Sequence, residues 1–382
     1  MEYTDGIYFD MPEADYHALP RLSNSGIKKL LVSPADFWVD SWMNPDKEEK
    51  STGALNLGKA YHAAVFEPEY LNERFVSSFN ASQYAGILTN ATQVGEELAK
   101  RGETKKKTGE NAADQIERLL ATGYQGRILS VEQAKWEEER GDRIAIPADA
   151  WEQLQKDMDL LYADELINAR VSGGFAEVAV LWTDERTGIA MKCKFDKIKE
   201  DCWIDYKSFD NTREQSLEQC LADAMRYRKY YIQAYLYHTV IELIREEKIK
   251  CDWSNWRTEQ VALLKSILAR KSPLPIWYVF QQKSGVANIL EREIHIMKPE
   301  HVSNPVNAGG VDDEIREEVG ERTRRLSALG ALAEAEVTQA MNWFGYCMDT
   351  YGPDKPWGAL KPTGVIDDDC FPPYWLGLEE KF

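Results

Sequence analysis

Trp203-Ile204-Asp205-Tyr206-Lys207 is an apolar stretch that contains one carboxylate and one ammonium group. Side chains alternate between the two faces of a β-strand, so Asp205 and Lys207 are expected to point the same way. A carboxylate binds a hard divalent cation such as Mg²⁺ through oxygen, and a lysine beside it can orient or help deprotonate a water molecule. Because unpaired charges are costly to bury, the pair indicates a chemical site.

Two more strands are expected just before this stretch. Residues 175–182 form one apolar run, and residues 189–198 alternate between apolar and polar side chains. The segment between them ends at Gly188 and is typical of a hairpin turn. The three segments therefore predict an antiparallel meander whose last strand is 203–208.

The meander brings three carboxylates into play. Asp196 lies nine residues before Asp205, and Glu177 lies on the hairpin partner of the strand that carries Asp196. Carboxylates that converge near one point repel each other unless a cation lies between them. A salt-bridged structural cluster with neighbouring lysines is the alternative.

A long helix is expected over residues 214–248. Arg226, Tyr230, Gln233 and Tyr237 have the spacing i, i+4, i+7 and i+11 along it. Residues at this spacing share one face of a helix. A strand pair, 276–282 and 288–296, and a polar helix over about 311–346 are expected to follow.

The N-terminal part reads as mostly helical. Ser23 and Ser25 precede an apolar helical run, and Ser33-Pro34 is expected to end that helix and begin the next. The two early hydroxyls are suited to helix capping or to phosphate contact at a helix N-terminus. His62 lies on a further helical run over residues 57–66.

Residues 85–150 are more polar and are expected to form a helical insertion. Lys105, Lys106 and Lys107 stand between two short amphipathic helical runs. This arrangement resembles the helix-linker-helix module of the SAP type, which binds DNA. A charged insertion without a binding role is the alternative.

Composition limits the choice of function. The 382 residues include 46 basic and 64 acidic side chains, for a net charge of −18. This balance argues against a surface covered with basic groups, but it allows a local basic channel. None of the six cysteines forms a C-x-x-C pair, which disfavours a zinc or iron-sulfur site. We find neither an apolar run of membrane-spanning length nor a signal sequence, so we expect a cytoplasmic protein without a membrane partner.

These motifs together resemble the PD-(D/E)XK nuclease superfamily. Asp196 and Asp205-Tyr206-Lys207 match its core acid and D-x-K motif. Gln233-Ala234-Tyr235-Leu236-Tyr237 matches the Q-x-x-x-Y motif of the RecB-like branch, and His62 matches the upstream histidine of that branch. The segment that begins at Leu22 resembles phage RecE-type exonucleases of the exonuclease VIII family. The chain lacks the spaced cysteines of the iron-sulfur branch.

The resemblance implies an α/β fold with a central mixed sheet flanked by helices. It implies a nuclease domain over residues 1–300, with the insertion at 85–150, and a C-terminal helix and irregular tail over 301–382. The implied activity is metal-dependent 5′ to 3′ degradation of one strand from double-stranded DNA ends. Such enzymes leave a 3′ single strand for an annealing recombinase, and they often form a ring-shaped homo-oligomer around DNA.

The resemblance also assigns roles to residues. It makes Mg²⁺, or Mn²⁺, the cofactor, and the expected ligands are Asp196, Asp205, the Tyr206 carbonyl, His62 and Glu177. Lys207 would position the attacking water, and Gln233 and Tyr237 would hold that lysine or the scissile phosphate. The expected DNA contacts are Ser23, Ser25, Arg226, Tyr230, Lys105, Lys106 and Lys107.

Three alternatives stay open at this point. A structure-specific or single-strand endonuclease would share the same metal chemistry. A non-catalytic DNA-binding or assembly protein could keep the fold, although intact Asp205, Lys207 and Gln233 speak against it. An α/β enzyme of unrelated chemistry has no supporting motif, because a glycine-rich phosphate loop, G-x-S-x-G and H-E-x-x-H are all absent from the sequence.

Overall fold

The computed structural model describes residues 3–48, 52–211, 213–249, 253–270, 272–283, 288–297 and 326–358. Contacts divide the chain into two compact units. The first unit consists of Met1–Lys50, Arg170–Phe280 and Ile289–Phe382, and the second of Ser51–Ala169 and Gln281–Asn288. The expected domains, 1–300 and 301–382, stay a prediction about which parts of the chain fold on their own.

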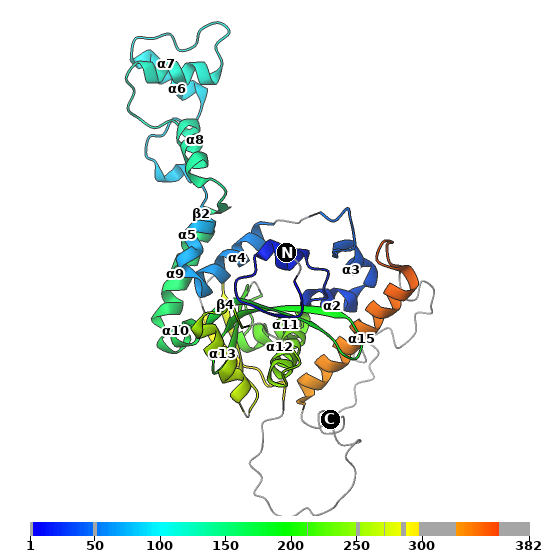
Figure 1. The fold of residues 1–382 in the computed structure, drawn as a ribbon. Helices are drawn as coiled ribbons and strands as arrows, with labels where there is room; N and C mark the ends of the chain where they lie inside the picture. Colours follow the sequence, from blue (N-terminus) through cyan, green and yellow to red (C-terminus); the bar gives the residue numbers. More distant parts are fainter. Residues whose placement is uncertain are drawn as a thin grey trace, which may run out of the picture. The chain divides into compact units, whose positions relative to one another are not determined.

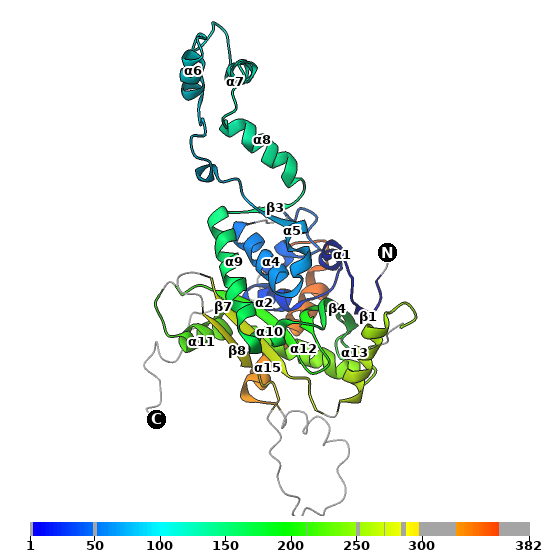
Figure 2. The same ribbon diagram turned by 90° about the vertical axis from the view of Figure 1, so that its left-hand side faces the viewer.

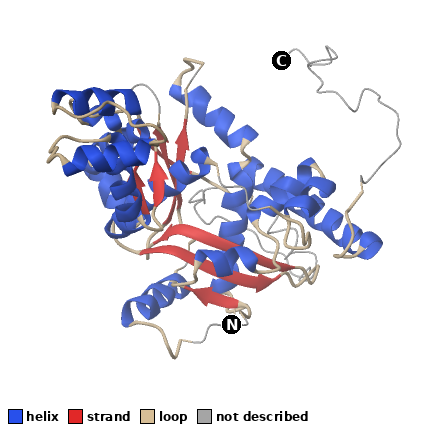
Figure 3. Ribbon diagram, turned by 90° about the horizontal axis from the view of Figure 1, so that it is seen from above, coloured by secondary structure: helices blue, strands red, loops and turns tan. Residues whose placement is uncertain are grey.

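A six-stranded mixed sheet forms the centre of the first unit, in the order β1-β4-β5-β6-β7-β8. Figure 3 shows its strands with helices packed beside them. This architecture confirms the predicted α/β fold with a central mixed sheet. The strands are β1 (Gly6–Tyr8), β4 (Phe175–Thr183), β5 (Ala190–Ile198), β6 (Trp203–Phe209), β7 (Ile276–Gln282) and β8 (Ile289–Glu293).

The predicted meander is confirmed as β4, β5 and β6, which pair in antiparallel register. Val178 pairs with Phe195, and Trp182 pairs with Met191. All four side chains are buried in the main hydrophobic core. The period-two alternation of the sequence therefore located these strands correctly, because one face of the hairpin is covered by apolar side chains.

Helices cover this apolar face of the sheet. Buried residues of α2, α12, α13 and α15 share the main core with β4 and β5. On the other face, Tyr16 of α1 packs in a smaller cluster with Ala179 and Leu181 of β4. The helices of this unit are α1 (Glu13–Ala18), α2 (Asn24–Val32), α3 (Pro34–Asp40), α10 (Glu165–Val171, which spans the boundary of the units), α11 (Leu217–Tyr227), α12 (Tyr230–Arg245), α13 (Thr258–Ala269) and α15 (Ala328–Tyr351).

The expected helix over 214–248 is wrong in one respect, since the chain forms two helices there. α11 ends at Tyr227 and α12 begins at Tyr230, with Lys229 between them in a left-handed conformation at φ 49°. A left-handed residue cannot continue a right-handed helix. Arg226 therefore does not share a helix with Tyr230, and the predicted common face holds only within α12.

The N-terminal helix signals are confirmed. Ser23 caps α2, where its side chain accepts a hydrogen bond from the Gly26 N–H, and Ser33 caps α3. Pro34 occupies the first position of α3, where its missing N–H costs no helical hydrogen bond.

The second unit contains the helical insertion. The pair α6 and α7 encloses a small core of Val94, Leu98, Leu119 and Ile128, and Figures 1 and 2 show this pair beyond α8. β2 and β3 pair in parallel. The elements are α4 (Gly53–Phe66), a 3₁₀ turn (Pro68–Tyr70), α5 (Leu71–Arg74), β2 (Phe75–Ser77), a 3₁₀ turn (Ala81–Gln83), α6 (Ala91–Lys100), α7 (Ala112–Ala121), α8 (Leu129–Arg140), β3 (Ile144–Ile146) and α9 (Ala148–Ala163).

The C-terminal region is described in part. α15 packs against α2 and α12. Residues 311–325 of the expected polar helix and most of the expected tail, 359–382, lie outside the described residues. Within the described part of the chain, every helix is too short or too polar to cross a membrane.

Candidate active site

Asp205 and Lys207 lie at the centre of the candidate site, and they form an ion pair on β6. Asp205 is fully buried, and the Lys207 side chain is 14% exposed. Gln233 of α12 donates a hydrogen bond from Nε2 to Asp205 Oδ2. The predicted same-face placement of Asp205 and Lys207 is therefore present, and the glutamine contacts the carboxylate of this pair.

Lys207 is held as a cation. Burial alone would lower the pKa of Lys207, but the carboxylates of Asp205 and Asp196 raise it well above its ordinary value. The Lys207 Nζ also lies 5.1 Å from the ring centroid of Tyr230 and 5.9 Å from that of Tyr278. A lysine in this state can donate hydrogen bonds to a water or a phosphate, but it cannot accept a proton.

The three acids lie in one row across the meander. The β4–β5 register pairs Ala176 with Lys197 and Val178 with Phe195, so Glu177 stands opposite Asp196 although the ladder skips this position. The β5–β6 ladder pairs Lys197 with Ile204. Its next step would pair Asp196 with Asp205, but within these described strands the ladder ends before it. Register alone therefore aligns Glu177, Asp196 and Asp205.

Asp196 bridges the place where β5 and β6 separate. Its Oδ2 accepts a hydrogen bond of 3.2 Å from the Tyr206 N–H. Burial raises the pKa of Asp196 to about 6; Lys207 opposes this shift, and Glu177 adds to it. A buried carboxylate with a second carboxylate nearby is the environment in which a bound cation relieves both burial and repulsion.

Glu177 has an unusual backbone, with φ 54° in the middle of β4. Only a small share of non-glycine residues adopt a left-handed conformation, and such strain concentrates at functional sites. The Glu177 side chain is 30% exposed and pairs with Lys194 of β5. The strand-register slip that would turn Glu177 away from Asp196 is absent from the described hairpin.

The donor set of this row fits a hard divalent cation. Carboxylate oxygens of Glu177 and Asp196 lie within 4.8 Å of each other. Asp205, the other expected acid, is engaged by Gln233 and Lys207. Two half-buried carboxylates at this separation offer the oxygen ligands that Mg²⁺ and Mn²⁺ prefer.

The remaining expected residues of α12 and α11 have separate places. The Tyr237 hydroxyl donates a 2.7 Å hydrogen bond to the carbonyl of Lys194, so it holds β5. The Tyr230 ring lies beside the Lys207 ammonium, and its carbonyl accepts a hydrogen bond from Tyr278. Arg226 is exposed on α11.

Two expected sites belong to the second unit. His62 is half-buried on α4, with its ring centroid 6.2 Å from that of Phe66. Lys105, Lys106 and Lys107 are exposed between α6 and α7. The backbone of this lysine segment is held in place, because Gln115 donates a hydrogen bond to the Lys105 carbonyl and Glu110 accepts one from the Lys107 N–H.

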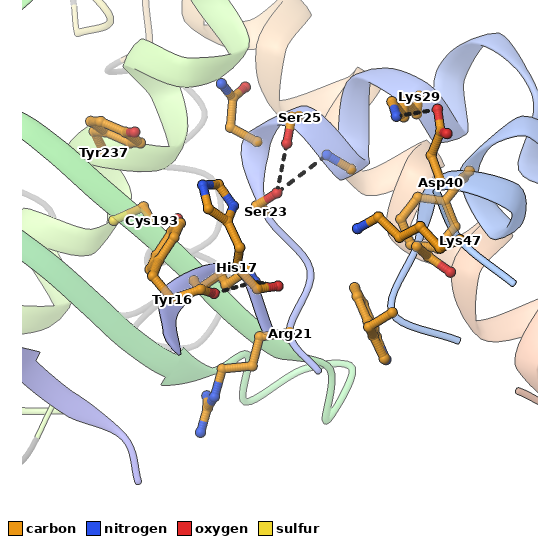
Figure 4. A pocket seen from close by; sticks show the side chains of 16 residues that line it. Tyr16, His17, Arg21, Ser23, Ser25, Lys29, Asp40, Lys47, Cys193 and Tyr237 are labelled. Carbon is orange, nitrogen blue, oxygen red and sulfur yellow. Dashed lines mark hydrogen bonds and ion pairs between the residues drawn. The ribbon is translucent and has the colours of Figure 1, made fainter. Parts of the chain in front are cut away.

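Ser23 and Ser25 border a cavity of about 210 Å³ in the first unit. Figure 4 shows their hydroxyls close together at the N-terminus of α2, and the two Oγ atoms are 2.9 Å apart. The carboxamide oxygen of Asn24, which also lines the cavity, is buried without a hydrogen-bond partner among the described residues. A helix N-terminus with hydroxyl and amide groups is suited to an anion.

Cations outnumber carboxylates around this cavity. Arg21 pairs with Asp5, and Lys29 pairs with Asp40. Lys192 is buried, and its ammonium donates only to the backbone carbonyls of residues 16, 17 and 19. Burial, with the nearby cations of Lys47 and Arg21, lowers the pKa of Lys192 to about 8. The cavity therefore carries a surplus of positive charge.

Sequence reasoning missed Lys28, which lies on α2. Its ammonium is 5.2 Å from the Tyr230 ring centroid, near the Asp205–Lys207 pair. Lys28-Lys29 in the sequence looks like an exposed face of an amphipathic helix. Only the packing of α2 against α12 brings the first of these lysines to the site.

Comparisons with known proteins agree with this geometry at the level of the fold. No curated protein matches the sequence significantly. A solved structure from Eubacterium rectale, whose title assigns exonuclease activity only provisionally, is 12% identical over 87% of each chain, with a TM-score of 0.40. That similarity is too low to carry an argument. The profile of one family matches residues 23–253, which is more than half of the chain and includes every carboxylate of the row. The chain therefore belongs to the family described as a PDDEXK-like domain of unknown function (DUF3799).

Proposed function

We propose that this protein is a divalent-cation-dependent nuclease that hydrolyses phosphodiester bonds in DNA. The observation that carries the proposal is the row Glu177–Asp196–Asp205 with the Lys207 ammonium beside it. Membership of a PDDEXK-like family supports it. An ion-pair cluster with only a structural role would not need a strained backbone at Glu177 or a buried Asp196 with a raised pKa.

Glu177 and Asp196 would hold the cation, and we propose Asp205, the Tyr206 carbonyl and His62 as further ligands. Mg²⁺ or Mn²⁺, when bound, would supply positive charge that stabilises the deprotonated nucleophile and the charge on the phosphate. Lys207 would donate a hydrogen bond to the attacking water. Gln233 would keep the Asp205 carboxylate in place, and Tyr237 would position the strand that carries Asp196.

The reaction is hydrolysis. The water oxygen forms a bond to phosphorus while the bond from phosphorus to the O3′ leaving group breaks. One water proton ends on O3′, and the other is released as the new phosphate monoester ionises. Because Lys207 is already protonated, it orients the water and does not remove its proton.

The proposed DNA contacts lie outside this centre. Ser23 and Ser25 would bind a backbone phosphate in the positively charged cavity at the start of α2. Lys105, Lys106 and Lys107 would contact phosphates through exposed ammonium groups, for which the described residues provide no ion pair. Arg226 and Tyr230 are further proposed contacts.

The finer function rests on the sequence motifs. We propose a cytoplasmic RecE-like phage exonuclease that degrades one strand of duplex DNA from 5′ to 3′. It would leave 3′ single-stranded ends for an annealing recombinase in DNA recombination. A ring-shaped homo-oligomer with a basic channel would reconcile this activity with the net charge of −18.

The test compares linear duplex DNA, labelled in separate preparations at the 5′ or the 3′ end of one strand, with closed circular DNA in Mg²⁺. Early release of the 5′ label, with the circle intact, supports a 5′ to 3′ exonuclease. Cutting of the circle would show an endonuclease instead. DNA binding without cleavage in Mg²⁺ or Mn²⁺ would show a binding or assembly protein.

A further inference from the structure

Lys28 brings a second ammonium group to the candidate active site. Its Nζ lies 5.2 Å from the ring centroid of Tyr230, and the Lys207 Nζ lies 5.1 Å from the same centroid. Both distances are within the range of a cation–π interaction. One aromatic ring is therefore shared by the lysine of the D-x-K motif and a lysine from a different helix.

The two lysines differ in how their charge is balanced. Lys207 is paired with the Asp205 carboxylate. Among the described residues, no carboxylate pairs with the Lys28 ammonium and no hydrogen bond to it is formed. Burial lowers the pKa of Lys28 to about 7, and the cation of Lys207 adds to this effect while Asp205 opposes it. A half-buried cation beside a like charge is costly unless an anion approaches it.

Other charged groups near Lys28 do not remove this imbalance. Arg228 and Lys229, between α11 and α12, also disfavour its charged form. Lys229 is itself paired with Glu336 of α15. The site therefore contains an uncompensated positive charge at the position of Lys28.

Close packing holds Lys28 in this place. Ile27 and Leu30 on either side of it are fully buried in the main core. A Cβ atom at Gly26 would lie 2.8 Å from Leu22 Cδ1 and 3.0 Å from Phe37 Cε2, so this turn of α2 has no space for a larger residue. The lysine is therefore presented from a fixed helix, which favours precise binding of a small anionic group.

We propose that Lys28 binds a non-bridging oxygen of the phosphate that is hydrolysed. The proposal rests on the proposed nuclease function. A phosphate beside a water oriented by Lys207 must lie near the Tyr230 ring, where Lys28 is the cation that no carboxylate neutralises. Its ammonium would donate a hydrogen bond to the phosphate without transferring a proton, and Lys207 would remain available for the water.

The test uses Lys28→Gln, Lys28→Arg and the control Lys265→Gln. Lys265 is exposed on α13, where removal of one charge leaves the candidate site intact. Affinity for a short duplex is measured in Ca²⁺ over a range of salt concentrations, and single-turnover cleavage is measured in Mg²⁺. Thermal unfolding of each variant reports whether it is folded.

For Lys28→Gln we expect a loss of about tenfold to a hundredfold in kcat/KM, since a hydrogen bond to a charged group is lost. The dependence of log affinity on log salt should become less steep by about one, because one phosphate contact disappears. Lys28→Arg should recover part of both, and Lys265→Gln should match the wild type. A thermal midpoint for Lys28→Gln at or above the wild-type value would show that folding is intact.

Equal affinity, salt dependence and cleavage for Lys28→Gln and Lys265→Gln would overturn the proposal. If the wild type binds DNA but cleaves with neither Mg²⁺ nor Mn²⁺, the nuclease function fails. In that case a selective loss of affinity in Lys28→Gln would still support Lys28 as a phosphate ligand. The two failures are thus distinguishable.

Discussion

Glu177 lies directly opposite Asp196 in the β4–β5 register, at a position where the antiparallel ladder is interrupted. The interruption coincides with the left-handed backbone of Glu177. Phe175 and Ile198 on one side of it, and Val178 and Phe195 on the other, all pack into the main core. The strand alternation therefore changes phase at this pair, which places two carboxylates where a regular hairpin would continue its ladder.

Glu177→Gly separates the strain of this backbone from the function of the carboxylate. Glycine adopts a left-handed φ without steric cost, so relief of the strain should stabilise the chain by about 1 kcal/mol. The same change should weaken Mg²⁺ binding, because one of the two close carboxylates is lost. Calorimetric titration and thermal unfolding measure the two effects, with Glu177→Gln as the variant that retains the strain. Glu177→Gly with lower stability and unchanged Mg²⁺ affinity would contradict both roles.

The raised pKa of Asp196 makes the stability of the cation-free protein depend on pH. The folded chain holds the proton of Asp196 up to pH about 6, whereas an unfolded aspartate releases it near pH 4. The stability from this group is therefore complete below pH about 4 and is lost as the pH rises through about 6. Thermal unfolding in EDTA from pH 4 to 7.5 should show a decline that Asp196→Asn reduces. Identical pH profiles for the two proteins would refute the shift.

Mg²⁺ should reverse this loss. A cation between Glu177 and Asp196 favours the charged form of both, so the increase in thermal midpoint on adding Mg²⁺ should be larger at pH 7.5 than at pH 5. Asp196→Asn should show little increase at either pH. A shift that does not depend on pH would mean that the ion binds elsewhere.

Lys207 contributes to stability as well as to chemistry. Lys207→Ala leaves the buried Asp205 carboxylate without its cation, which should cost about 3–5 kcal/mol of folding free energy. The double variant Asp205→Asn/Lys207→Met removes both charges and should recover much of this loss while it stays inactive. Denaturant unfolding and cleavage assays follow the two properties. Recovery of cleavage together with stability would show that this pair has only a structural role.

The lysine segment of the insertion should affect DNA binding without affecting the chemistry. Replacing Lys105, Lys106 and Lys107 with glutamine should weaken duplex binding and reduce the salt dependence of affinity by up to about three phosphate contacts. The α6–α7 core should remain folded, because its buried residues are unchanged. A cleavage rate at saturating DNA equal to that of the wild type is expected. Unchanged affinity would leave the insertion as a charged surface with no role in binding.

Local patterns in the sequence predicted the parts of the fold that depend on local physics. The alternation in β5 and the hairpin turn located the meander, and Ser23 and Ser33-Pro34 marked where helices begin. Lys229 was missed because neither glycine nor proline marks the break between α11 and α12. Its left-handed backbone depends on tertiary packing, including the ion pair with Glu336 more than a hundred residues later.

The candidate site was predictable only in part for the same reason. The spacing of Asp205 and Lys207 places them on one strand face, but the alignment of Glu177 with Asp196 depends on the register between strands. The contact of Gln233 with Asp205 was suggested by a motif and not by any local rule. Lys28 had no sequence signal, since its position depends on which face of α2 packs against α12.

The most direct test of a cation-dependent nuclease centred on this row is cleavage of a labelled linear duplex in Mg²⁺ and in EDTA. The wild type and the control Lys265→Gln should cleave in Mg²⁺ at equal rates and should be inactive in EDTA. Asp196→Asn, folded by thermal unfolding, should be slower by about a thousandfold or more, as expected for loss of a group that holds the catalytic ion. Cleavage by Asp196→Asn at the wild-type rate, or by the wild type in EDTA, would contradict the assignment of this site.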